Sequence, residues 1–287
     1  MKKATYLIVL LALSITVKAQ KSAQFNFRYL PKHQNKLNMK MDMGMNMDLG
    51  GDSAQIAKLK AEGAPANMVM DMNMNAVTTM ITGTPKADKN FPFTMTYSDF
   101  TTKMKMNGTE MNTPSANING KSISGECDAA GNLHVDTVGL NVDPKINASV
   151  MEMMNKMQKQ IKFPDKPLAI GESFTQEIPL NMPITGMNMD LKMKTSYTLT
   201  AIKEGKGYFD MVVTMNFGMD ADRTGANVNG KGTAKGTGKV VFDIAQHYPV
   251  SMISDIDMDL VMSVNPQKIN MKMKMKSDVQ NEIIKTN

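Results

Sequence analysis

The strongest constraint on the fold is a strict alternation of apolar and polar residues between positions 37 and 49. Every second position is apolar, and the positions between are polar or glycine. The apolar set is Leu37, Met39, Met41, Met43, Met45, Met47 and Leu49. Alternate side chains of a β-strand point to opposite faces, whereas at about 100° per residue the same set would scatter around a helix. The segment is therefore predicted to be a strand with one apolar face.

The same period recurs along the chain, and the recurrence defines the predicted fold class. Alternating segments are Met68–Ala76, Met187–Met193, Ile256–Val264 and Ile269–Met275, and further strand signals cover Phe93–Met106, Tyr197–Ile202, Tyr208–Phe217 and Lys239–Ile244. This density is typical of an antiparallel sheet with one covered face. Residues 227–238, rich in Gly, Lys and Thr, are expected to form a loop or irregular hairpin. The prediction is a mainly β fold of long antiparallel strands that form a curved sheet or half-barrel.

One hairpin can be predicted in register. Residues 265–268 have turn chemistry between two alternating runs. A four-residue loop there would place Leu260 opposite Met273 on one face and Asp257 opposite Lys276 on the other. Opposite-charge pairs across strands contribute about 0.2–1 kcal/mol each, so both faces favour this pairing.

Two short covering helices are predicted between the strands. One begins at residue 52 or 53 and ends near residue 59, and the other spans residues 149–161, where Ser149 and Glu152 form a capping box. The chain is divided accordingly into an N-terminal β-rich half (21–146), an amphipathic helix or connector (147–163) and a C-terminal β-rich half (164–287). A pseudo-repeat of the two halves is one interpretation of this division.

The first 20 residues have the pattern of an export signal peptide. Lys2 and Lys3 precede a short apolar stretch, and small residues at positions 17 and 19 fit a cleavage site. We expect an exported chain that begins at residue 20 or 21, in the periplasm or alternatively outside the cell. No later segment approaches the roughly 20 apolar residues of a membrane-spanning helix, so no membrane span is expected.

The charge pattern argues against nucleic-acid binding. Three of the 33 lysines and arginines lie in the predicted signal, which leaves 30 basic side chains against 27 acidic ones. Arg28 and Arg223 are the two arginines, and no basic cluster is interleaved with aromatic residues. A nucleic-acid surface needs a dense phosphate-neutralising patch. No nucleic-acid partner is therefore expected.

The residues that could carry catalysis do not form a recognisable motif. Cys127 is the one cysteine, and the flanking carboxylates are expected to raise its pKa and reduce its nucleophilicity. His33, His134 and His247 lie far apart in the sequence. The chain is predicted not to be an enzyme, although a pocket that brought His134 or His247 beside a carboxylate would reopen the question.

The 32 methionines allow a metal-binding interpretation. Thioethers are soft ligands that favour Cu(I), and the segment from Met39 to Met47 resembles the methionine motifs of periplasmic copper proteins. The candidate ligands are Met39, Met41, Met43, Met45 and Met47. Methionine as an adaptable core residue is the favoured interpretation. The methionines spread over at least five predicted strands, share positions with Leu, Ile and Val, and have no accompanying histidine or second cysteine.

A third interpretation is an apolar binding face. Burying a methionine side chain is worth about 1.5–3 kcal/mol, so a face of this size must be covered by something. We predict a non-enzymatic envelope protein that binds a lipid, another apolar ligand or an envelope protein, and that needs no cofactor. The predicted contact residues are Met39, Met41, Met43, Met70, Met72, Met258 and Met273. A Cu(I)-binding or buffering protein and a purely structural protein are the alternatives.

Two segments carry a resemblance to a family. Residues 166–174 read KPLAIGESF and residues 195–199 read TSYTL. They resemble an uncharacterised family of exported Gram-negative proteins, in which Lys-Pro, an apolar pair, Gly-Asp/Glu-Ser and an aromatic precede a Tyr-x-Leu strand. Phe174 stands where that pattern has tryptophan. The family has no established activity, so the resemblance implies no catalytic residues. More distantly, long strands with covering helices resemble the half-barrel of periplasmic lipoprotein carriers.

Overall fold

The structure is a computed structural model. It describes residues 21–50, 57, 67–111, 119–129, 132–136, 162–184, 187–223, 226–264 and 267–286. The predicted helix at 149–161 lies outside the described residues, as does the predicted helix at 52–59 apart from residue 57. The predicted signal peptide also lies outside them.

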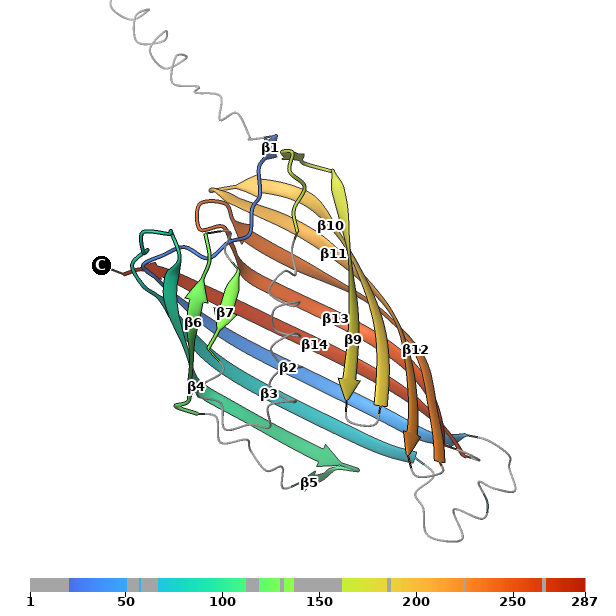
Figure 1. Ribbon diagram of the computed structural model, residues 1–287. Coiled ribbons are helices and arrows are strands. Elements are labelled where there is room, and N and C mark those ends of the chain that lie inside the picture. The colour runs from blue at the N-terminus through green and yellow to red at the C-terminus, as the bar shows by residue number, and fades with distance from the viewer. Residues whose placement is uncertain are drawn as a thin grey trace, which may run out of the picture.

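Most of the described chain belongs to one antiparallel sheet of 12 strands (Figure 1). Its long strands are β2 (His33–Gly50), β3 (Asn67–Thr82), β4 (Phe91–Met106), β9 (Ser173–Ile184), β10 (Met187–Lys203), β11 (Lys206–Arg223), β12 (Ala226–Asp243), β13 (Tyr248–Val264) and β14 (Gln267–Lys285). Its short strands are β5 (Thr109–Met111), β6 (Ser122–Cys127) and β7 (Leu133–Val135). A separate pair is formed by β1 (Ser22–Ala23) and β8 (Leu168–Ala169). The prediction of a mainly β, antiparallel fold is confirmed.

The strand order joins the two ends of the chain. The sheet runs β7-β6-β4-β3-β2-β14-β13-β12-β11-β10-β9, with β5 beside β4. The first long strand, β2, therefore lies against the last one, β14, over its whole length from His33 to Gly50. This pairing makes one continuous sheet from strands at both ends of the sequence.

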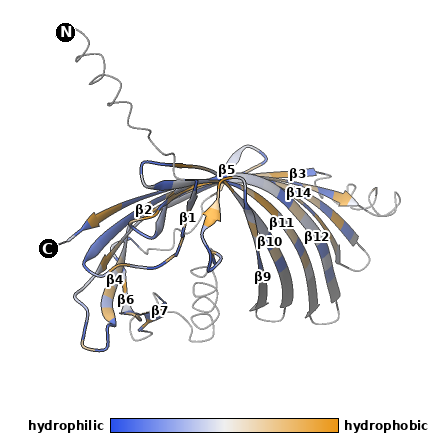
Figure 2. Cartoon of the chain, turned by 90° about the horizontal axis from the view of Figure 1, so that it is seen from above, coloured by the Kyte–Doolittle hydropathy of each residue, from blue (hydrophilic) through white to orange (hydrophobic). Residues whose placement is uncertain are grey.

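The sheet is curved, and residues 21–32, which carry β1 and which we call the N-terminal segment, lie on its concave side (Figure 2). Strand β12 contains Gly230, Gly232, Gly236 and Gly238 at alternate positions on one face. A Cβ at Gly236 would lie 2.6 Å from the carbonyl oxygen of Asp255, so only glycine allows β13 to approach this closely. The prediction of a loop at residues 227–238 is wrong, because these glycines belong to a central strand.

The predicted hairpin is present, but its register differs by two residues. Val264 pairs with Gln267, so two residues separate the strands instead of four. Leu260 consequently lies opposite Met271, and Asp257 opposite Lys274. A shift of two residues keeps every side chain on its face, so alternation alone could not distinguish the two registers.

An aromatic core fills one end of the sheet. Phe25 of the N-terminal segment packs against Phe209 and Phe242, with ring centroids 5.0 and 5.9 Å apart, and against Phe163 at 5.3 Å. Residues of β10 to β12 complete this cluster, among them the fully buried Leu199. The N-terminal segment thus covers this end of the sheet, which we call the covered end.

A second, smaller cluster contains the single cysteine. Cys127 is 0% exposed and packs with Tyr29, Phe91, Phe93 and Leu133. Burial raises the pKa of its thiol to about 12, and the neighbouring Asp128 carboxylate adds to the increase. The predicted direction of the pKa shift is confirmed, with burial as the larger cause.

Candidate functional site: a methionine-rich concave face

The antiparallel register brings methionines from adjacent strands onto one face. We call this surface the methionine field. It consists of Met39, Met41, Met43, Met45 and Met47 of β2, Met68, Met70, Met72 and Met74 of β3, Met104 and Met106 of β4, Met258 and Met262 of β13, and Met271, Met273 and Met275 of β14. These strands are neighbours in the order β4-β3-β2-β14-β13. Methionines that are spread over five strands of the sequence therefore lie together on one face of the sheet.

Rows of methionines cross the field at right angles to the strands. One row joins Met106, Met70, Met45, Met273 and Met258, each directly opposite the next. Side chains directly opposite one another on antiparallel strands have Cβ atoms about 4.5–5.5 Å apart. The thioethers of neighbouring strands are therefore within contact range.

The field is only half-buried. Every one of its methionines keeps part of its surface accessible, including all the contact residues predicted from the sequence. Met80 and Met211 lie on the same face toward the covered end and are 5% and 6% exposed. The described chain thus packs methionine fully at the covered end and leaves it partly open in the field.

The contacts of the N-terminal segment show that the field lies on the concave side of the sheet. Phe25 contacts Phe209, and the register places Phe209 opposite Val240, which lies opposite Met252. Met252 in turn lies opposite Val279, and Val279 opposite Met39. The field and the covered end are therefore two parts of one face, and Figure 2 shows the N-terminal segment on its concave side.

The convex face carries the charges. Lys274 Nζ lies 3.1 Å from Asp257 Oδ1, and Lys239 Nζ lies 2.8 Å from Asp210 Oδ1. All four side chains are more than half exposed. Exposed pairs of this kind contribute little stability, about 0–1 kcal/mol, so their main effect is to keep this face solvated.

Three polar residues of β13 and β14 interrupt the apolar concave face toward the covered end. Ser254 and Ser277 lie on adjacent strands, with their Oγ atoms 2.7 Å apart. Further along β14, the amide nitrogen and oxygen of Asn281 are both buried without a hydrogen-bond partner in the described structure. Sequence reasoning missed this boundary, although the interruption of the apolar alternation at Ser277 and Asn281 was its visible signal.

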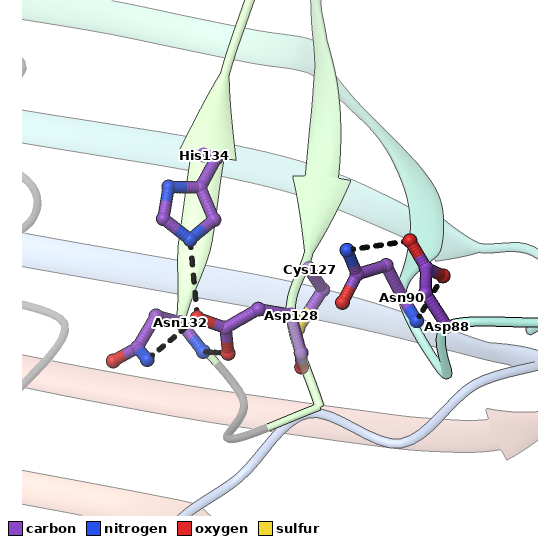
Figure 3. A network of polar contacts seen from close by, with 6 residues as sticks. All are labelled: Asp88, Asn90, Cys127, Asp128, Asn132 and His134. Atoms are coloured by element: carbon purple, nitrogen blue, oxygen red, sulfur yellow. Dashed lines mark hydrogen bonds and ion pairs between the residues drawn. The ribbon is translucent and has the colours of Figure 1, made fainter. Parts of the chain in front are cut away.

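The histidines do not form a recognisable catalytic centre. His134 Nε2 lies 3.1 Å from Asp128 Oδ2 (Figure 3), and Asp128 also accepts hydrogen bonds from the backbone and side-chain nitrogens of Asn132. The sequence makes a carboxylate beside His134 in a pocket a condition for catalysis, but it does not predict Asp128 as the partner. The His134 side chain is 67% exposed, so this group lies at the surface, beside the pairing of β6 with β7, and not in a pocket.

The other two histidines have different partners. His33 Nδ1 lies 2.7 Å from the carbonyl oxygen of Pro31, and His247 Nε2 lies 2.9 Å from Arg28 Nη2. Among the described residues, no group of three or more His, Cys, Asp and Glu side chains could hold a metal ion. No described helix has both the length and the apolar character needed to cross a membrane.

The fold and this face together define a curved antiparallel sheet with an apolar concave side and a charged convex side. No family model and no curated protein matches the sequence. Among solved structures, a triple mutant of the Rh. blastica porin is 8% identical, with 85% of this chain and 99% of that chain covered and a TM-score of 0.29.

Two other structures give similar values. OccK5 (OpdH) of Pseudomonas aeruginosa is 7% identical, with 89% of this chain and 99% of that chain covered and a TM-score of 0.26. LpxR from Salmonella typhimurium is 8% identical, with coverages of 84% and 99% and a TM-score of 0.15. The similarity to porins is distant, and at these TM-scores it carries no inference about this chain.

Proposed function

We propose that the protein is an exported, non-enzymatic envelope protein that binds a lipid-like ligand on the methionine field. The observation that carries the proposal is the half-buried state of the whole field. Large exposed apolar patches on soluble proteins mark binding surfaces. Each buried CH₂ group of a lipid chain contributes about 0.8 kcal/mol, so a chain lying along the field would bind through many small contacts.

The chemistry of the field favours hydrocarbon over protein as the occupant. Its side chains are thioethers and aliphatic groups, and the Asp, Asn and Lys residues of the same strand segments lie on the opposite face. A protein partner would bring backbone amides that find no partner on such a surface, at a cost of roughly 1–3 kcal/mol for each group left unpaired. A lipid chain has no polar groups to satisfy.

Methionine suits a ligand of variable shape. Its unbranched side chain has three rotatable bonds and fills irregular spaces. The finer architecture that we propose is a half-barrel of two similar halves that meet at β2 and β14, with the ligand on its concave side. The resemblance to lipoprotein-carrier half-barrels supports this proposal, and the two covering helices remain a prediction from the sequence.

Native mass spectrometry of the protein purified from the envelope of its own cells tests the proposal. The expected spectrum contains protein with bound lipid that is released on denaturation. A spectrum of ligand-free protein, together with failure to bind a fluorescent fatty acid, would reject lipid binding and favour a structural role.

A pair of variants tests the location of the site. Met72→Lys places a charge in the field, whereas Asn73→Lys places the same charge one residue away on the convex face, beside Asp42. We expect Met72→Lys to weaken fatty-acid binding at least tenfold and Asn73→Lys to leave it within twofold. Equal effects of the two variants would place the binding site elsewhere.

A further inference from the structure

We propose that the methionine field also binds Cu(I), through thioether sulfurs of β2 and its two neighbours. The inference is independent of lipid binding, because it depends on sulfur and not on apolar surface. The inference is based on the pairing of the methionine-bearing strands, which brings thioethers from segments far apart in the sequence next to one another on one face.

The densest part of this sheet lies along β2. Four consecutive methionine pairs join β2 to β3, namely Met41–Met74, Met43–Met72, Met45–Met70 and Met47–Met68. Three more join β2 to β14, namely Met47–Met271, Met45–Met273 and Met43–Met275. The methionines at the centre of β2 therefore have a methionine on both sides.

Strand geometry brings three sulfurs within reach of one ion. Opposite Cβ atoms are about 4.5–5.5 Å apart across strands, and residues two apart on one strand are separated by about 6.7 Å. Each methionine can move its sulfur over several ångströms by rotating its side chain. Met43, Met45 and Met70 form one such triplet.

The field also selects against harder metal ions. Thioether ligands favour Cu(I), whereas Mg²⁺, Ca²⁺ and Mn²⁺ favour oxygen, and Zn²⁺ requires thiolate, imidazole or carboxylate ligands. The carboxylates nearest in sequence, Asp42 and Asp48, lie on the other face of β2. His33 shares the face of the field, but it is six residues before Met39 and its Nδ1 lies 2.7 Å from the carbonyl oxygen of Pro31. A soft monovalent cation is therefore the ion that this surface fits.

Competition with a chromogenic Cu(I) chelator, in ascorbate and without oxygen, tests the proposal on the full chain. We expect the protein to take Cu(I) from the chelator at micromolar concentration, and X-ray absorption to show a copper shell of sulfur atoms. Failure to compete, or a shell of oxygen and nitrogen, would overturn the proposal. Native mass spectrometry with Ag(I), a soft ion without redox chemistry, should show bound silver, and its absence would count against the site.

Leucine substitutions separate sulfur from apolar surface. Replacing the five β2 methionines together by leucine leaves directly opposite methionine pairs in the field only at Met70–Met106, Met72–Met104 and Met258–Met273. Because Met and Leu differ little in volume, the apolar face should persist. The number of Cu(I) ions bound per chain should fall at least twofold, because only triplets formed by β3 with β4 and by β14 with β13 remain. Circular dichroism and urea unfolding close to those of wild type would report correct folding.

A matched control lies outside the field. Met193 and Met215 lie opposite each other on β10 and β11, and Met215 is opposite Ala234 on its other side. Replacing both by leucine should change Cu(I) binding less than twofold. Equal losses in the two variants, or unchanged binding in the β2 variant, would overturn the assignment. If wild-type protein binds Cu(I) but no fatty acid, the proposed lipid-binding function is rejected and the Cu(I) proposal stands.

Discussion

Arg28 and His247 are joined twice. The guanidinium Nη2 of Arg28 lies 2.9 Å from His247 Nε2, and the Arg28 backbone N–H donates to the His247 carbonyl oxygen at 3.1 Å. Because a guanidinium only donates hydrogen bonds, His247 Nε2 must accept, and the ring must be neutral. Burial and the Arg28 charge lower the pKa of His247. The contact fixes the segment that carries Phe25 over the covered end.

Acidification should therefore destabilise the protein through His247. Since its pKa is lower in the folded chain, the unfolded chain takes up this proton first as the pH falls. The stabilising contribution is complete above the unfolded pKa of about 6.5 and is lost as the pH falls through the folded value. Urea unfolding at pH 7.5 and pH 5 should show a smaller loss of unfolding free energy for His247→Asn than for wild type.

Asparagine is the matched replacement at this position because His247 has a φ of 56°, a conformation that Asn tolerates. The Asp243 carboxylate acts in the opposite direction and raises the pKa of the ring. Asp243→Asn should therefore increase the loss on acidification. The same loss in wild type and His247→Asn would assign the pH dependence to other groups.

Glycine on the concave face of β12 should be required for stability. A Cβ at Gly236 would meet the Asp255 carbonyl oxygen at 2.6 Å and the Ile256 Cα at 3.0 Å, and these backbone atoms cannot rotate away. Gly236→Ala is expected to lower the unfolding free energy by about 1–3 kcal/mol. Gly218→Ala is the control, because nothing lies within 4 Å of its Cβ.

For the control we expect a change of less than about 1 kcal/mol, of either sign, since alanine also restricts the unfolded chain. Denaturant unfolding followed by circular dichroism measures both variants. Equal destabilisation at the two positions would show that strand propensity, and not close approach of β13, determines the cost.

Cys127 should be unreactive in the folded protein. Its thiol is fully buried, and the increase of its pKa from 9.0 to about 12 lowers the thiolate fraction near neutral pH by about 1000-fold. A thiol reagent such as dithionitrobenzoate should react slowly without urea and rapidly in urea. In a Cys127→Ala background, Ser124→Cys places a thiol at an exposed position of the same strand and should react without unfolding.

Comparable rates for Cys127 and the exposed thiol would mean that the second aromatic cluster opens readily. That result would also contradict the close packing of Tyr29 and Phe91 around the sulfur.

The outer edge of β9 should be protected by its prolines. In the described part of the chain β9 pairs only with β10, with Pro179 opposite Lys192 and Pro183 opposite Asn188. Proline has no N–H, so on an edge strand it removes donors that another strand could use. Replacing both prolines by valine should increase self-association in analytical ultracentrifugation.

Thr175→Val is the control, since it adds valine at an exposed position of β9 and retains both prolines. Its association should equal that of wild type. Increased association in this control, or none in the double variant, would refute protection by proline.

The sequence was sufficient to predict which side chains share a face. Alternation places Met39 to Met47 together whatever the neighbouring strand is, because it depends only on extended backbone. Alternation does not identify the neighbour, however. Every strand of the field has the same pattern, so the pairing of β2 with β14 could not be distinguished from other pairings. The hairpin error has the same origin, because Asp257 finds a lysine opposite in either register.

The remaining differences come from tertiary context. The sequence predicts a loop at residues 227–238 because glycine is intrinsically unfavourable in strands. In the sheet, the absence of side chains at these glycines leaves space for Phe217 and for the backbone of β13. The contact between Asp128 and His134 depends on the register in which β6 pairs with β7, which single-residue preferences do not specify. The unpaired amide of Asn281 became visible only once its surroundings were known.

The pairing of β2 with β14 has a consequence for biosynthesis. Strand β2 is made early, yet it has no partner on one side until residues 267–285 have also been made. Contacts between such distant segments form slowly, and strands that wait with an apolar face uncovered are prone to aggregate. Maturation therefore requires that the early strands stay soluble until the last one arrives, and loss of residues 267–285 would leave β2 with a permanently open side.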